Sequence, residues 1–209
     1  MNWYHWMALA ALLFAAGSCT MHFLRLIRLG KPTDHARAAG SEARGIAYSF
    51  TGAMSPSKKE SAYLHLPTYT AGLVYHAGTF NAIILLAFAL AGPVPGGFPG
   101  GVIAGFLAVS TAAGIFILIK RAVVRKLRIL SNPDDYLSNV LVTLFQLATI
   151  ALLTWGRPVE VAYFLAAAAL FFYLPVGKLK HLVYFFAARY QLGLFFGRRG
   201  VWPGKRGSE

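Results

Sequence analysis

The stretch LPTYTAGLVYHAGTFNAIILLAFALA, from Leu66 to Ala91, decides the fold class of this chain, because it contains no charged side chain. A helix needs about 20 mostly apolar residues to cross a hydrocarbon core of about 30 Å. This stretch, with 26 residues, is longer than that requirement. It therefore predicts a transmembrane helix, and the rest of the chain can be compared with it.

The composition agrees with a membrane protein. Hydrophobic residues make up 57% of the 209 residues and charged residues only 13%, whereas soluble domains carry about 25% charged residues. This excludes a disordered chain and a soluble nucleic-acid-binding protein, despite the formal net charge of +13. The single cysteine, Cys19, excludes a disulfide scaffold, a zinc cluster and a cysteine-ligated iron–sulfur centre within this chain.

Five apolar segments predict an all-α protein with a five-span transmembrane helical bundle. No Lys or Arg precedes the first segment, so we expect it to be retained rather than cleaved as a signal peptide. A turn rich in Gly and Pro, residues 92–101, separates the second segment from the third. The segment after Lys180 predicts an interfacial C-terminal helix. The predicted spans are residues 6–29, 66–91, 102–119, 136–155 and 161–178.

The basic residues predict the orientation of the bundle, because Lys and Arg in short flanking loops stay on the cytoplasmic side. With five spans, 19 of the 20 Lys and Arg residues fall on one side and only Arg157 on the other. We therefore expect a multi-pass protein of the cell inner membrane with its N-terminus outside. Residues 1–190 would form the transmembrane domain and residues 191–209 a basic cytoplasmic tail. The loop 30–60 and the aromatic segment 184–196 are candidate docking surfaces.

The ionisable residues narrow the function classes. The acidic residues are all expected in loops, which argues against a proton-driven transporter, since such proteins place acidic groups inside their spans. The six histidines are more informative. His5 lies among aromatic residues at the outer interface, where an aromatic belt is expected. His35 lies in a loop, so neither histidine indicates a functional site.

Two other histidines are candidate metal ligands. His76 lies inside the second span and His181 at the end of the fifth, both in the cytoplasmic part of the predicted bundle. Two imidazoles that face each other across a helix bundle can serve as the axial ligands of a b-type haem. Lys178 and Lys180, or Arg121 and Arg125, could then pair with the propionates. The alternative is that the histidines hydrogen-bond to carbonyls or reach the lipid headgroups.

Two segments also resemble a known family: SPSKKESAYLHLPTYTAGLVYHAGTF, residues 55–80, and LPVGKLKHL, residues 174–182. The chain resembles the gamma subunit of respiratory nitrate reductase and, more closely, the cytochrome b subunits of menaquinol complexes associated with sulfite reductase or like heterodisulfide reductase. The resemblance implies haem b as the cofactor and a menaquinone or other quinone as the substrate. It also implies a cytoplasmic iron–sulfur partner subunit that is similar to heterodisulfide reductase. It also allows further membrane or periplasmic redox subunits, in anaerobic respiration or sulfur metabolism.

The resemblance also implies a ligand set. In the nitrate reductase subunit, spans two and five each supply two histidines to two stacked haems. His76 and His181 match the pair nearer the cytoplasm, whereas Leu86 and Tyr163 stand at the positions of the outer pair. The resemblance therefore implies one haem, at the cytoplasmic side. A second haem would need His22 and His65 as ligands.

His65 and Tyr69 form a candidate quinone contact. They are four residues apart, and His65 and His76 are eleven apart, so all three share one face of a helix with 3.6 residues per turn. A histidine in this place could donate a hydrogen bond to a quinone carbonyl. The alternative is that His65 caps the span or binds a phospholipid.

The sequence thus predicts a membrane cytochrome b subunit that passes electrons between the quinone pool and an iron–sulfur partner. It lacks acid pairs, reactive thiols and nucleotide-binding glycines, so we expect an electron-transfer subunit of an oxidoreductase complex rather than an enzyme alone. An alternative is a cofactor-free membrane anchor or assembly subunit that recruits a soluble redox enzyme. A third class is a transporter, against which the acid-free spans argue.

Overall fold

In a computed structural model, all regular secondary structure in residues 1–30, 33–58, 62–92 and 94–204, the parts that the structure describes, is helical. The basic residues Lys31, Lys59, Lys205 and Arg206, which we assigned to the cytoplasmic side, lie outside these ranges. Four of the described helices are long and apolar enough to cross a membrane. A fifth crossing is reached if α7 and α8 count together as one interrupted span. The described residues are therefore all-helical in their regular structure, with helices long and apolar enough to span a membrane.

The four long helices lie where the hydropathy predicts them. The second, α3, has the bounds predicted from the sequence, while α4 begins earlier, within the stretch predicted as a turn. Pro99 falls in the first turn of α4, where the missing N–H costs nothing because no partner exists for it. These helices are α1 (Trp3–Arg28), α3 (Leu66–Ala91), α4 (Gly97–Val123) and α6 (Pro133–Trp155).

The fifth predicted span, residues 161–178, is shorter than expected. Helix α7 (Glu160–Tyr173) ends before Pro175, and the Gly177 N–H closes a turn on the Tyr173 carbonyl at 2.9 Å. Proline cannot supply the N–H that would continue the helix. Helix α8 (His181–Arg198) follows this break and continues well past residue 191, where we expected a tail to begin.

Several shorter helices were not expected from the sequence. Helix α2 (Glu42–Phe50) lies in the loop 30–60, and α5 (Arg125–Ile129) connects α4 to α6. Both are too short for a hydropathy pattern to identify them. The remaining turns of 3₁₀-helix are η1 (Gly52–Met54), η2 (Ala62–His65), η3 (Arg157–Val159) and η4 (Lys178–Lys180).

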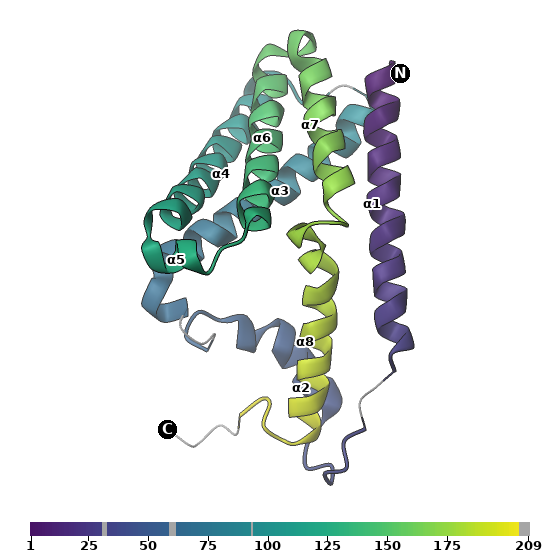
Figure 1. Cartoon of the computed structure of the whole chain (residues 1–209), viewed down its shortest axis with the longest axis vertical. Helices are drawn as coiled ribbons and strands as arrows, with labels where there is room; N and C mark the ends of the chain where they lie inside the picture. Colours follow the sequence, from purple (N-terminus) through teal and green to yellow (C-terminus); the bar gives the residue numbers. More distant parts are fainter. Residues whose placement is uncertain (31–32, 59–61, 93, 205–209) are drawn as a thin grey trace. The chain divides into compact units, whose positions relative to one another are not determined.

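The chain divides into two compact units. Unit 1 comprises Met1–Ser18 and Pro67–Leu179, and unit 2 comprises Cys19–Leu66 and Lys180–Glu209. Unit 1 therefore contains the first part of α1 together with α3 to α7. Unit 2 contains the end of α1 together with α2 and α8 (Figure 1).

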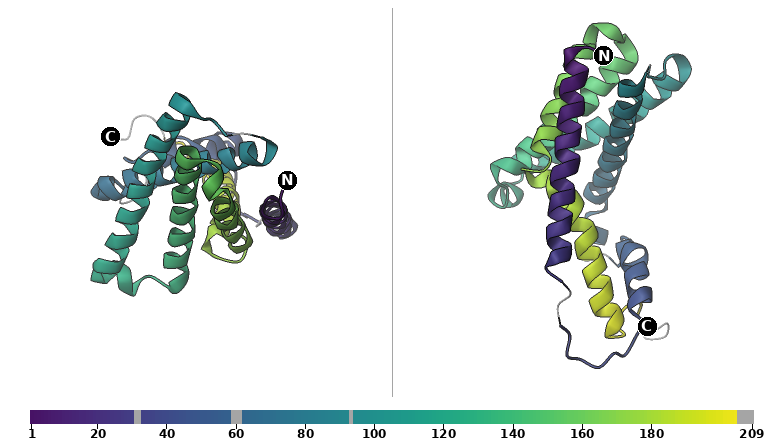
Figure 2. Two further views of the ribbon diagram at one scale, coloured as in Figure 1. Left: turned by 90° about the horizontal axis from the view of Figure 1, so that it is seen from above. Right: turned by 90° about the vertical axis from the view of Figure 1, so that its right-hand side faces the viewer.

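In unit 1, α6 packs between α4 and α7, and α5 joins the ends of α4 and α6 (Figure 2). Helix α3 crosses α4 and α6 obliquely (Figure 1). The start of α1 adds an alanine stripe, Ala8, Ala11 and Ala15, to the same hydrophobic core. The spacing of these alanines places them on one helical face. Alanine has no side-chain rotamers to lose, so the helix packs closely here without a cost in side-chain conformational entropy.

In unit 2, α2 and α8 lie side by side (Figure 2). Their backbones meet at glycines: a Cβ atom at Gly45 would collide with the backbones of Gly193 and Gly197. Gly193 and Gly197 are four residues apart, which is the spacing of the small residues that let two membrane helices approach closely. We call this contact the glycine contact of unit 2.

Candidate functional site

His76 lies on the exposed side of α3, next to the buried Tyr75. Its Nδ1 lies 2.7 Å from the carbonyl oxygen of Gly72, one turn earlier in the helix. A carbonyl only accepts, so Nδ1 carries the proton and donates. The basic nitrogen is then Nε2, which is the arrangement found in most metal-binding histidines, because the second hydrogen bond fixes the tautomer and the ring orientation.

His181 is the first residue of α8 and is also exposed. It belongs to unit 2, whereas His76 belongs to unit 1. The two predicted axial ligands therefore belong to different units. The structure gives the local setting of each histidine, and the pairing of the two stays a prediction.

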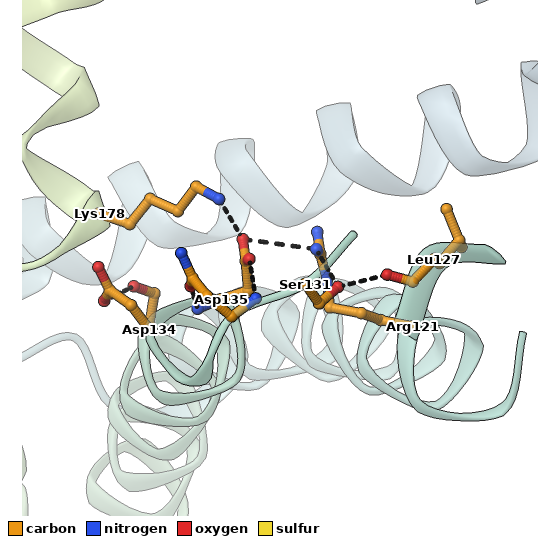
Figure 3. A network of polar contacts seen from close by, with 8 residues as sticks. Arg121, Leu127, Ser131, Asp134, Asp135 and Lys178 are labelled. Carbon is orange, nitrogen blue, oxygen red and sulfur yellow. Dashed lines mark hydrogen bonds and ion pairs between the residues drawn. The ribbon is translucent and has the colours of Figure 1, made fainter. Parts of the chain in front are cut away.

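Lys178, predicted to meet a haem propionate, has an acidic partner within unit 1. Its Nζ lies 2.5 Å from Oδ1 of Asp135, and Arg121 approaches the same oxygen at 3.4 Å (Figure 3). Asp135 is buried, with a side chain only 5% exposed. Two cations thus flank one carboxylate where the end of α4, the start of α6 and η4 meet, and Asp134 beside Asp135 balances the second positive charge. Lys180 lies at the end of η4, in unit 2.

The acidic residue of this cluster was placed in a loop by the sequence analysis, and that placement was wrong. Asp135 lies in the first turn of α6, where its Oδ2 accepts the Asn132 N–H at 3.0 Å and its own N–H donates to Asn132 Oδ1 at 3.1 Å. This reciprocal cap satisfies two N–H groups at the helix start. The sequence Asn132–Pro133–Asp134–Asp135 carried the signal, since an Asn cap and a proline at the next position mark a helix start.

The other predicted ligands are distributed as follows. His65 ends η2 in unit 2, while Tyr69 lies on α3 in unit 1. His22, on the part of α1 that belongs to unit 2, has its Nδ1 3.4 Å from the hydroxyl of Tyr184 on α8. The structure thus gives His22 a tyrosine partner that the sequence did not indicate.

The two positions that resemble the outer ligand pair are part of the hydrophobic core. Leu86 is 1% exposed and Tyr163 is fully buried. The Tyr163 ring stacks on Phe145 at 5.8 Å between centroids and meets Phe164 edge-on at 5.1 Å. Both positions are therefore filled by tightly packed side chains of unit 1.

A polar network that the sequence analysis missed lies between α3, α4 and α6. The Tyr75 hydroxyl lies 2.8 Å from Thr143 Oγ1, and Gln146 Nε2 donates to Thr79 Oγ1 at 2.9 Å. Thr111 on α4 donates to Gln146 Oε1 at 3.2 Å. These groups have no charge and satisfy one another, which suits a bilayer interior where water is absent. We call them the polar network of unit 1.

His5 also has a partner besides the aromatic neighbours predicted for it. Its Nε2 lies 3.1 Å from Oε1 of Glu160, and Tyr4 donates to Oε2 of the same carboxylate at 3.2 Å. The imidazole also stacks on Tyr4, with ring centroids 4.5 Å apart. The first turn of α1 is thereby joined to the first turn of α7.

No group of three or more His, Cys, Asp or Glu side chains that could hold a metal ion occurs among the described residues. A haem with two axial histidines would need only two such side chains. Comparisons of the chain with models of protein families, with curated proteins and with solved structures found no match. The function is therefore inferred from the residues themselves.

Proposed function

We propose that this chain is a membrane cytochrome b subunit that passes electrons between a quinone pool and a cytoplasmic iron–sulfur partner. The observation that carries the proposal is the setting of His76. An exposed imidazole on an apolar helix, with Nδ1 held by the Gly72 carbonyl at 2.7 Å, presents Nε2 as a ligand. A histidine within a membrane span is a functional candidate by default, because its ring is costly to bury in hydrocarbon.

The donor set fits a b-type haem. His76 and His181 would supply the two axial nitrogens, and a bound haem would supply the one-electron chemistry that this chain lacks. Lys178 and Arg121, which meet at Asp135, are our candidates for the partners of the haem propionates near the interface. The tight packing of Leu86 and Tyr163 supports a single haem, because these side chains occupy the positions of the outer pair.

The contacts within unit 1 support the predicted orientation, in which successive spans cross the membrane in opposite directions. The start of α1 contacts the start of α7 through His5 and Glu160, and Asp135 at the start of α6 contacts the end of α4 and Lys178, which follows α7. The basic end would face the cytoplasm by the distribution of Lys and Arg. We place the chain in the cell inner membrane, with its N-terminus outside.

The partner would dock on the cytoplasmic side. The two segments proposed for docking, the loop 30–60 and the aromatic segment 184–196, include α2 and most of α8, which pack against each other in unit 2. One surface can therefore present both. His65 and Tyr69 remain our candidates for a quinone contact, and the quinone would exchange electrons with the proposed haem.

The test is a dithionite-reduced minus oxidised spectrum with a pyridine haemochrome count on the purified full-length chain. His76→Ala and His181→Ala should each lose the b-type signal, because a low-spin haem needs both axial nitrogens. His35→Ala is the matched control, since His35 is exposed in a loop outside the proposed site. One haem per chain in the wild type and the control is expected.

Three results would contradict this proposal. A full haem content in the His76→Ala variant would show that another residue holds the iron. A folded wild-type chain without any haem would favour the alternative of a cofactor-free membrane anchor. Two haems per chain would contradict the single-site proposal and point to His22 and His65 as further ligands.

A further inference from the structure

The corner between α4 and α6 is the most basic part of unit 1. It runs from Lys120 to Leu130 and includes α5; we call it the basic corner. Five cations fall within the nine residues from Lys120 to Arg128. The corner connects two helices that are long enough to cross a membrane, so it lies at a boundary between hydrocarbon and water.

Two of these cations are engaged within unit 1. The Lys120 ammonium group donates to the Thr68 hydroxyl. Arg121 donates to Ser131 Oγ at 2.9 Å and pairs with the buried Asp135 (Figure 3). These two side chains hold the corner against α3 and α6.

The other three cations are exposed. Within the described part of the chain, no carboxylate forms an ion pair with Arg125, Lys126 or Arg128. The sequence also contains no Asp or Glu between Glu60 and Asp134. The nearest carboxylates, Asp134 and Asp135, form no described ion pair with these three cations, so an anion outside the chain is the natural partner.

The same corner exposes large apolar side chains beside these cations. Val123 and Ile129 are each 72% exposed, and Leu130 is 82% exposed. Apolar residues next to Arg and Lys, between two membrane helices, match an element that inserts its apolar side chains below the headgroups while its cations stay among the phosphates. A soluble acidic partner would complement the charge and leave these apolar side chains unexplained.

We propose that the basic corner binds the headgroups of anionic phospholipids. Arg125, Lys126 and Arg128 supply the positive charge and the hydrogen-bond donors for the phosphate oxygens, and Val123, Ile129 and Leu130 enter the acyl-chain region. The proposal requires the chain to span a membrane and does not depend on haem. Its failure and that of the proposed electron transfer are therefore separable.

The test is lipid binding by the full-length chain in detergent, measured by native mass spectrometry during titration with phosphatidylglycerol or phosphatidylcholine. We expect the triple variant Arg125→Gln/Lys126→Gln/Arg128→Gln to bind phosphatidylglycerol roughly a hundredfold more weakly, at roughly fivefold for each cation removed. The variant Arg125→Lys/Arg128→Lys, which keeps the charge, should retain binding. Phosphatidylcholine should bind weakly to all of them.

The matched control is Arg25→Gln/Arg28→Gln/Arg37→Gln, which removes the same charge from exposed positions elsewhere. It should lose much less affinity than the corner variant. An equal loss in both triple variants would contradict the proposal, because it would show attraction to net charge alone. Inorganic phosphate that displaces the lipid fully would also contradict it, since the apolar side chains would then contribute nothing. Unchanged lipid binding with lost binding of an acidic protein partner would assign the corner to that partner.

Discussion

The helices of the two units contact one another through different chemical groups. In unit 1, α3 meets α4 and α6 through neutral hydroxyl and amide groups, of which Gln146 is fully buried. In unit 2, α2 meets α8 through bare backbone at glycines, with charged pairs around it, such as Arg198 with Glu42 at 3.3 Å. Hydrocarbon tolerates satisfied neutral groups far better than charges. The neutral contacts of α3 with α4 and α6 therefore suit the bilayer interior, and the charged pairs around α2 and α8 suit its boundary.

A glycine allows close approach of two helices in both units, but the atoms that lie next to the glycine differ. A Cβ atom at Gly78 would meet Oγ and Cβ of Ser110, whereas a Cβ atom at Gly45 would meet only the backbone of α8. No rotamer change relieves either clash, but a second substitution can remove the Ser110 side chain, whereas a helix backbone has to move as a whole. The glycine contact of unit 2 should therefore be the less tolerant of the two.

The largest expected effect is that of Gly45→Val. The added side chain would force α2 away from α8 and also break the paired contacts of Ser49 with Arg189, in which Ser49 Oγ donates to the Arg189 carbonyl at 2.6 Å. Overpacking of this kind costs about 3 kcal/mol, which is enough to undock a nine-residue helix. Hydrogen exchange of residues 42–50 should rise to nearly unprotected rates.

The control for this variant is Gly204→Ala, because nothing lies within 4 Å of a Cβ atom at that position. It should leave the exchange of α2 unchanged. If α2 kept its protection from hydrogen exchange in Gly45→Val, α2 and α8 would not meet at Gly45. The difference between the helix contacts of the two units would then disappear.

An intermediate effect is expected for Gln146→Leu in unit 1. Leucine has a similar volume but cannot replace the hydrogen bonds to Thr79 and from Thr111. Polar contacts between membrane helices contribute about 0.6 kcal/mol on average and at most about 1.7, so we expect a loss of about 1 kcal/mol in the free energy of unfolding. Equilibrium unfolding in detergent would measure it.

The matched control is Thr154→Val, which removes a hydroxyl that donates only to carbonyls of its own helix. Its effect should be clearly smaller. If Gln146→Leu lowered the free energy of unfolding more than Gly45→Val does, the polar network of unit 1 would be the less tolerant contact, contrary to the expected order.

The smallest effect concerns Asp34, which accepts two hydrogen bonds from Arg199 at 3.1 Å in unit 2. The hydrogen bond from Arg199, followed by that from the Ala36 N–H, lowers the pKa of Asp34 from 3.8 to about 2. The contact therefore contributes fully above pH 3.8 and is lost as the pH falls through about 2. Asp34→Asn should increase hydrogen exchange near residue 36 at pH 6, with little difference from the wild type left near pH 2. A difference that grows as the pH falls would contradict this assignment.

The sequence predicted the elements that depend on hydropathy and missed those that depend on contact. The charge-free run at residues 66–91 gave α3 with both ends correct, because twenty apolar residues have few alternatives to a membrane helix. The shortened α7 could have been anticipated from Pro175. Helix α2 could not, since its stability comes from glycines far away in the sequence, although the Gly193–Gly197 spacing offered a hint.

The candidate site was predictable only as single residues. His76 was found because a lone histidine in an apolar run is conspicuous, and its hydrogen bond to Gly72 follows from helix geometry. The cluster of Arg121, Asp135 and Lys178 was missed because its residues come from three separate elements, the end of α4, the start of α6 and η4. No pattern along the chain reports which helix ends meet. The same reason hid the contact between His5 and Glu160.

The early end of α7 has a consequence for the surrounding lipid. With 14 residues and a rise of about 1.5 Å for each, α7 is about 21 Å long, against a hydrocarbon thickness of about 30 Å. Helix α7 alone therefore falls short of a full crossing, and lipids beside it would have to shorten and disorder their acyl chains. Such hydrophobic mismatch favours thinner membranes and draws partner helices to the short side. The break at Pro175 thereby makes α7 the place on this protein where the bilayer itself is expected to deform.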